Sequence, residues 1–132
     1  MLAALCILAY APALSLPLFE DDYPLISLAD AAGPGGVLVN PVFRVRATSS
    51  WVMMLLWRTF HLAPFVYHLA SLLLHVANTW LVYGIGLAWP RMRAAAFWGA
   101  AFFAVAEGHQ EAIMWFSAIS ELLQFLFGAG AL

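Results

Sequence analysis

The chain has 132 residues, of which 65% are hydrophobic and only 9% are charged, and its formal net charge is −2. A soluble domain is nearer half apolar and a quarter charged, so this composition excludes an ordinary water-soluble protein and predicts an integral membrane protein. Its five cations are all arginines and are scattered, so no nucleic acid is expected as a partner. With Cys6 as its single cysteine, the chain can form no intrachain disulfide.

Apolar segments predict an all-α membrane protein with about four transmembrane helices, because a bilayer core about 30 Å thick takes roughly 20 helical residues. The spans are expected at about residues 2–19, 65–88, 94–106 and 112–132. Pro12 and Pro17 should kink or end the first span. No Lys or Arg precedes that span, which favours a retained helix over a cleaved signal peptide. Both chain ends fall inside apolar segments, so we expect a piece of a longer protein.

Residues 20–64 are expected to form an external loop between the first two spans. Its first part, 20–50, is polar and carries the turn signals Gly33-Pro34-Gly35-Gly36 and Asn40-Pro41. Residues 51–62 have apolar side chains at helical spacing together with Trp and Arg, which favour the level of the lipid headgroups. This pattern predicts one amphipathic interfacial helix lying flat on the membrane.

Arg91 and Arg93, in the tight turn between the second and third spans, indicate the orientation of the chain. Cytoplasmic loops concentrate Arg and Lys near span ends, so this turn is expected inside and the 20–64 loop outside. The turn at 107–111 is then also outside. Asp21, Asp22, His109 and Glu111 are therefore predicted to share one face of the membrane.

The acidic pair Asp21-Asp22 directly follows the first apolar run. Carboxylates tied to membrane segments are costly to dehydrate and are candidates for functional sites. One interpretation is structural: the acids form the polar edge of a span, with Asp22 capping the next helix. The other is chemical: one acid accepts a proton as a general base while its neighbour orients it, or the pair binds a cation. The residues alone leave both interpretations open.

Other polar residues have similar alternatives. His109 and Glu111 would point together only in extended or loop backbone, where with the acids they could form a mixed nitrogen and oxygen metal site. The spacing does not demand a metal, so no residue is assigned as a metal ligand, no cofactor is certain, and a divalent metal stays an open alternative. Arg44 and Arg46 could clamp a phosphate or anchor the loop to headgroups.

A polar stripe follows the second predicted span at intervals of three, four and three residues. Such stripes usually form hydrogen bonds between membrane helices. Because it lies nearest the outer end, His68 is the stripe residue expected beside the site. The stripe consists of His68, Ser71, His75 and Asn78.

Four stretches carry a family resemblance, in order and with matching gaps. They are Phe19-Glu20-Asp21-Asp22-Tyr23, the stretch 62–78 against the pattern LNP..YHL.N.LLH..N, His109-Gln110-Glu111-Ala112 against HP.H.EA, and the stretch 115–123 against WISGRSDLL. Together they resemble the multi-spanning glycosyltransferases of the GT-C superfamily, closest to the protein O-mannosyltransferase-like members and their bacterial relatives. The chain departs from these patterns at Ala106-Glu107, where the family often has His-Pro, and at Ile119, where it has Arg.

The resemblance implies that residues 1–132 are the N-terminal part of a GT-C transmembrane domain, inactive alone and located in a bacterial inner (plasma) membrane. It implies transfer of a sugar from a polyprenyl-phosphate donor to an acceptor hydroxyl outside the membrane, the acceptor being unspecified. Asp21 would act as the base with Asp22 in support, and Arg46 would neutralise the leaving phosphate. The further substrate-binding residues would be Arg44, His68, His109 and Glu111.

A second hypothesis is a non-enzymatic membrane bundle, such as an assembly subunit or one that handles ions. In that protein His75, Asn78 and Glu121 would serve as buried hydrogen-bonding groups or as a proton path.

Overall fold

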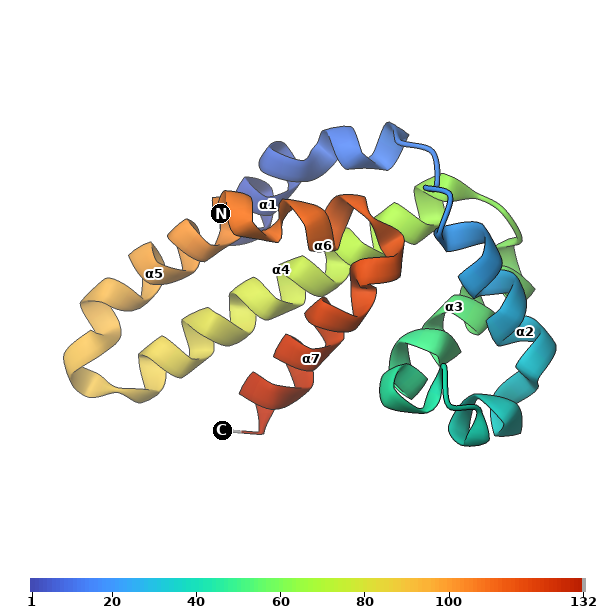
Figure 1. Ribbon diagram of the computed structural model, residues 1–132. Helices are drawn as coiled ribbons and strands as arrows, with labels where there is room; N and C mark the ends of the chain where they lie inside the picture. Colours follow the sequence, from blue (N-terminus) through green and yellow to red (C-terminus); the bar gives the residue numbers. More distant parts are fainter. Residues whose placement is uncertain (132) are drawn as a thin grey trace.

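The computed structural model describes residues 1–131 and is helical throughout, with no strand among these residues (Figure 1). The all-α prediction is therefore confirmed. The α-helices are α1 (Leu2–Tyr10), α2 (Asp22–Val39), α3 (Ala47–Phe60), α4 (Pro64–Ala88), α5 (Arg93–Val105), α6 (Gln110–Met114) and α7 (Ile119–Gly130). Five short 3-10 turns join them: η1 (Ala11–Ser15), η2 (Arg44–Arg46), η3 (Pro90–Met92), η4 (Glu107–His109) and η5 (Phe116–Ala118).

Helix α4 is the centre of a bundle that also contains α1, α5, α6 and α7 (Figure 1). It begins at Pro64, whose missing N–H costs nothing in a first helical turn. Its 25 residues reach about 37 Å, and it is long and apolar enough to cross a membrane. The helix predicted at 65–88 is thus confirmed and is a candidate membrane span.

The buried face of α4 is its polar face. His68, Ser71, His75 and Asn78 are fully buried, whereas Leu73 and Trp80 are exposed. A helix in a soluble protein has the opposite arrangement, with the apolar stripe inside. Lipid tails are as apolar as leucine, so a membrane helix gains little by hiding leucine and more by pairing its polar groups inside the bundle.

Helix α5 returns antiparallel to α4 and covers the segment predicted at 94–106 (Figure 1), but with 13 residues it is not among the helices long enough to span a membrane. Small residues allow the close approach: Ala96, Ala100 and Ala104 are all buried on one face of α5. At Gly86 of α4, an added Cβ would lie 2.7 Å from the Cβ of Ala96. The two backbones are therefore too close for any side chain at position 86.

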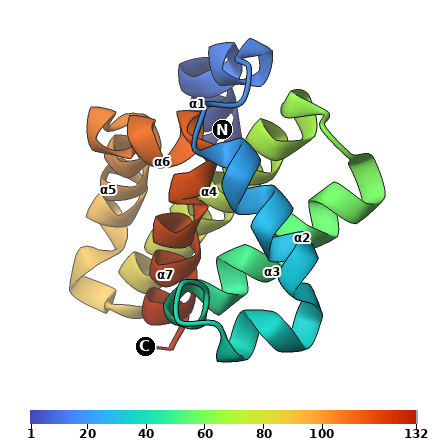
Figure 2. The ribbon, with the colours of Figure 1, turned by 45° about the vertical axis from the view of Figure 1, so that its right-hand side comes forward.

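Helices α2 and α3 pack side by side as a separate lobe (Figure 2). The polar loop predicted over 20–50 is wrong, because most of it is helical. Ile26, Ala29 and Val37 are buried against α3 and the following turn, and this packing outweighs the turn residues between them. The turn residues instead produce a kink within α2. It lies at Gly33, which has a φ of 67° and is followed by Pro34. The amphipathic helix predicted at 51–62 is present but begins earlier, at Ala47.

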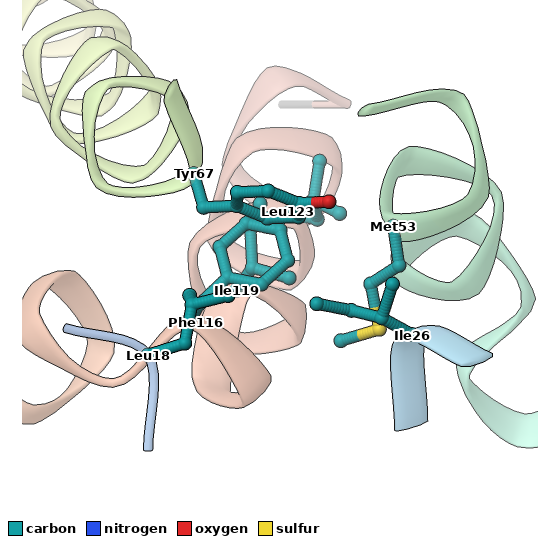
Figure 3. Packing of buried hydrophobic residues seen from close by; sticks show 7 residues of the cluster. All are labelled: Leu18, Ile26, Met53, Tyr67, Phe116, Ile119 and Leu123. Carbon is teal, nitrogen blue, oxygen red and sulfur yellow. The ribbon is translucent and has the colours of Figure 1, made fainter. Parts of the chain in front are cut away.

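One apolar cluster joins the lobe to the bundle (Figure 3). At its centre the rings of Tyr67 and Phe116 meet edge to face, with centroids 4.8 Å apart. An edge-to-face aromatic pair of this kind contributes about 0.5–1.5 kcal/mol beyond the burial of its area. The cluster consists of residues from the lobe, from the bundle and its turn η5, and from the chain just before α2: Leu18, Ile26, Met53, Tyr67, Phe116, Ile119 and Leu123.

Four continuous spans are not found among the described residues. One helix is long and apolar enough, and there are up to three spans if each of two bent pairs is counted as one. The first predicted span is shortened because α1 ends at Tyr10 and continues only as the turn that contains Pro12. The fourth, predicted at 112–132, is divided at Trp115, where the two helical parts meet at 109°. Residue 132 lies outside the described chain.

Candidate functional site

The two adjacent acids have opposite environments. Asp22 is fully buried, and its carboxylate accepts hydrogen bonds from the backbone N–H of Phe19 at 2.8 Å and from the N–H of Ser117 at 2.8 Å. The hydroxyl of Ser117 donates a third bond to the same carboxylate. Within residues 1–131 the one ion pair joins Arg58 and Asp30, so hydrogen-bond donors alone satisfy the Asp22 carboxylate.

This contact explains why the last predicted span is broken. Trp115 has extended backbone angles, φ −106° and ψ 105°, so the helical hydrogen-bond ladder stops there. The N–H of Ser117 points instead to Asp22, 95 residues earlier in the chain. A buried backbone donor must have an acceptor, and Asp22 supplies it. The structural interpretation of Asp22 is supported, but through this long-range contact rather than as a helix cap.

Asp21, by contrast, is exposed. It lines an open hollow of about 550 Å³ together with Phe19, Glu20 and Trp115. As the N-cap residue of α2 it makes no capping hydrogen bond with its side chain. Its carboxylate is therefore free to accept a proton from a molecule bound in the hollow.

Glu111 lines a second hollow, of about 440 Å³, which shares Phe19 and Trp115 with the first. The structure thus brings the Asp21 and Glu111 hollows together, as the sequence predicts for the outer face. Glu20 and Glu107 add two further carboxylates to these walls. No arginine lines either hollow.

His109 points elsewhere, into the bundle. Its ring lies 4.2 Å from that of Phe103 and 5.2 Å from that of His75, measured between centroids. It lines a small cavity of about 110 Å³ with Asn78 and Glu121. The loop backbone that would point His109 and Glu111 the same way is not present, because η4 and α6 are helical here.

Arg46 lines a cavity of about 240 Å³ at the start of α3. Ser49 and Ser50 are buried beside it, and both hydroxyls donate to the carbonyl oxygen of Arg46, at 2.8 and 3.1 Å. The remaining walls are apolar, apart from Ser117: they are Leu25, Val42, Phe43 and Met53. Arg44 lies on the same turn and, like Arg46, is exposed, but it does not line this cavity.

Ser117 connects the two halves of the candidate site. It lines the Arg46 cavity, and its partner Asp22 is the chain neighbour of Asp21 in the open hollow. The hollow lined by Asp21 and the cavity lined by Arg46 therefore adjoin the same buried contact, between Asp22 and Ser117.

His68 steadies the chain before the acids rather than lining a hollow. It is fully buried, and its Nε2 lies 3.4 Å from the carbonyl oxygen of Pro17. The acid turn, residues 19–22, and the turn containing Arg91 and Arg93 lie at opposite ends of α4 (Figure 1), and the side of the membrane that each faces stays a prediction.

No group of three His, Cys, Asp or Glu side chains among residues 1–131 is arranged to hold a metal ion. The divalent metal considered from the sequence therefore gains no support from these residues.

Comparison with known proteins adds no relative. A scan against protein-family models finds no match, and searches of the curated proteins and of the solved structures also find none.

Sequence reasoning assigned no site role to Ser117 or Trp115. Both fall in the stretch that resembles WISGRSDLL, so the signal for a site was present. What the pattern lacks is the partner: a contact between residues 22 and 117 follows from the packing of α2 against η5 and has no local sequence signature.

Proposed function

We propose that the protein is part of an integral membrane glycosyltransferase of the GT-C type. It transfers a sugar from a polyprenyl-phosphate donor to an acceptor hydroxyl on the extracytoplasmic side of a bacterial inner membrane. One observation carries the proposal: the exposed Asp21 and the partly apolar Arg46 cavity adjoin a single buried contact between Asp22 and Ser117.

The two halves of the candidate site, the Asp21 hollow and the Arg46 cavity, suit the acceptor and the donor respectively. In the reaction the acceptor oxygen bonds to the anomeric carbon, its proton passes to the Asp21 carboxylate, and the bond from that carbon to the phosphate oxygen breaks. The guanidinium of Arg46 offsets the charge that develops on the departing phosphate. The apolar walls beside Arg46 suit a phosphate attached to a lipid.

The remaining predicted residues have lesser parts in this scheme. Glu111 lines the acceptor side, and Arg44 attracts the anionic donor from the surface. His68 holds the segment before the acids, and His109 supports the bundle behind them. The external segment 20–64 would rest on the membrane through the exposed apolar residues of α2 and α3.

The direct test is Asp21→Asn, assayed with a short-chain polyprenyl-phosphate sugar and membranes containing the protein as its gene encodes it. General-base catalysis contributes typically about 10²- to 10⁴-fold, and a loss of that size is expected. Glu20→Gln is the matched control, because Glu20 lines the same hollow and carries the same charge. Wild-type turnover in Asp21→Asn would refute the assignment. Residues 1–132 purified alone should show no transfer.

A second candidate function is a non-enzymatic bundle that conducts protons. The cavity lined by Asn78, His109 and Glu121 favours it, since His75 also packs against His109. Proteoliposomes would then show a proton flux that Glu121→Gln abolishes and Asp21→Asn leaves intact. The transferase proposal expects no such flux.

A further inference from the structure

Ser117 is a buried residue in the short η5 turn, with 5% of its surface exposed. It gives two hydrogen bonds to one carboxylate oxygen of Asp22, one from its backbone and one from its hydroxyl. The second oxygen of that carboxylate accepts the N–H of Phe19. Ser117 is thus tied at both its backbone and its side chain to the acid turn.

The acid turn is itself closed by a short loop of hydrogen bonds. The N–H of Asp22 donates to the carbonyl oxygen of Phe19 at 3.0 Å, while the N–H of Phe19 donates to the Asp22 side chain. Asp21 lies inside this loop and has no side-chain hydrogen bond of its own as the N-cap of α2. The direction of the Asp21 side chain is therefore set by its neighbours. Among the described residues, Ser117 is the only one distant in the chain that hydrogen-bonds to the Asp22 side chain and so anchors this loop.

We propose that Ser117 is a positioning residue of the transfer site. Through Asp22 it fixes the direction of Asp21 relative to the Arg46 cavity, so that the proton acceptor faces the bond being formed. This inference rests on the proposed function only for the identity of the group being positioned. Asp22, on this assignment, is also a positioning residue and does not itself touch substrate.

The physical basis is the sensitivity of catalysis to placement. A displacement of about 1 Å at a reacting group can cost about 10²-fold in rate. Removing the hydroxyl of Ser117 leaves its backbone N–H bonded to Asp22, so the turn stays closed but less firmly held. Ser117 also lines the Arg46 cavity, but its hydroxyl is bonded to Asp22, so the ground-state binding of the donor by Arg46 and the apolar walls should hardly change.

Kinetics on the protein as its gene encodes it provide the first test. For Ser117→Ala we expect kcat to fall about 10- to 100-fold with the donor KM within about twofold of wild type. Ser117→Thr keeps a hydroxyl and should recover most of the rate. Ser120→Ala, one turn further along the chain, is the matched control and should behave as wild type. An unchanged kcat in Ser117→Ala would overturn the proposal.

A spectroscopic test does not depend on transfer. A nitroxide spin label on Asp21→Cys, in a Cys6→Ala background and in lipid nanodiscs, reports the mobility of the acid turn. Ser117→Ala should shift its spectrum to a more mobile component, Ser117→Thr should restore it, and Ser120→Ala should leave it unchanged.

The two readouts separate failure of this inference from failure of the proposed function. A spectrum unaffected by Ser117→Ala overturns the positioning role whatever the activity. A more mobile spectrum combined with no sugar transfer by any variant, wild type included, overturns the proposed function while the anchoring contact stands.

Discussion

The bundle and the lobe are both built from α-helices, but they bury different kinds of side chain. In the bundle, α4 turns its histidines and Asn78 inward and leaves Leu73 and Trp80 outside. In the lobe, α2 and α3 bury apolar residues such as Ile26 and Met53 against each other and the bundle, and place an ion pair at the rim. The first pattern suits a helix surrounded by lipid, and the second suits a pair of helices at a boundary with water.

The candidate site lies where these two patterns meet. The apolar cluster of Figure 3 and the contact between Asp22 and Ser117 are both made at this joint. A change at the joint should therefore damage both regions, whereas a change within one region should affect mainly that region.

The largest effect is expected at the joint. Asp22→Ala removes a buried acceptor and leaves the N–H groups of Phe19 and Ser117 without a partner. Each such loss costs about 1–3 kcal/mol, so unfolding in mixed micelles should require about 3 kcal/mol less free energy or more. Asp21→Ala, which breaks no side-chain hydrogen bond, should change stability by less than about 0.5 kcal/mol. Equal effects from both acids would contradict the division of roles between them.

Within the bundle, the close approach of α4 and α5 predicts the next largest effect. Gly86→Ala places a Cβ 2.7 Å from the Cβ of Ala96 and 3.1 Å from its Cα, so the helices must separate. Such overpacking costs about 1–3 kcal/mol. Gly84→Ala is the control, since nothing lies within 4 Å of its new Cβ, and it should be neutral or stabilising by up to about 1 kcal/mol. Thermal unfolding of the two variants would distinguish a packed hairpin from a loose one.

The sequence predicted the bundle better than the lobe, for a physical reason. The segment Pro64–Ala88 combines length, apolarity and a polar stripe, all of which are local features that survive in any packing. In the lobe, Gly33 and Pro34 are local signals for a turn and do interrupt the helix at Gly33, but the burial of Ile26, Ala29 and Val37 keeps the chain helical on both sides of it. The break at Trp115 is harder still, because it depends on an acid 93 residues away.

The same distinction applies to the site residues. Asp21 and Glu111 were expected on one face, and their hollows do adjoin, since hydropathy alone assigns both to turns at one end of the spans. His109 was expected beside them and instead packs against His75, because the helical backbone of the turn rotates it inward. Side-chain direction at a span end depends on one or two backbone angles, which composition does not determine.

A smaller effect is expected from the polar face of α4. Asn78 donates to the carbonyl oxygen of Leu122 in α7 at 2.9 Å, a bond between helices. Bonds of this kind average about 0.6 kcal/mol in membrane proteins and reach about 1.7 kcal/mol. Asn78→Leu should therefore lower the free energy of unfolding by about 0.6–1.7 kcal/mol. Thr79→Val is the control, because the hydroxyl of Thr79 donates to His75 within its own helix at 2.9 Å and, among the described residues, hydrogen-bonds to another helix only through the thiol of Cys6, at 3.4 Å. A loss above about 3 kcal/mol for Asn78→Leu would mean that the polar face does more than join α4 to α7.

The smallest effect is expected at the rim of the lobe, where Arg58 and Asp30 are 2.7 Å apart with 51% and 32% of their side chains exposed. An exposed ion pair of this kind contributes about 0–1 kcal/mol, and 1 M salt shortens the screening length to about 3 Å. Arg58→Ala should therefore cost at most about 1 kcal/mol at 0.15 M NaCl and less at 1 M, as chemical unfolding would measure. Asp30→Ala should cost more, because the indole N–H of Trp57 also donates to Asp30, at 3.2 Å.

Since Asp30 already neutralises Arg58, anionic lipid should bind the lobe through Arg44 instead. Arg44→Ala should therefore weaken binding to anionic vesicles more than Arg58→Ala does. The reverse order would show that the ion pair opens at the membrane surface.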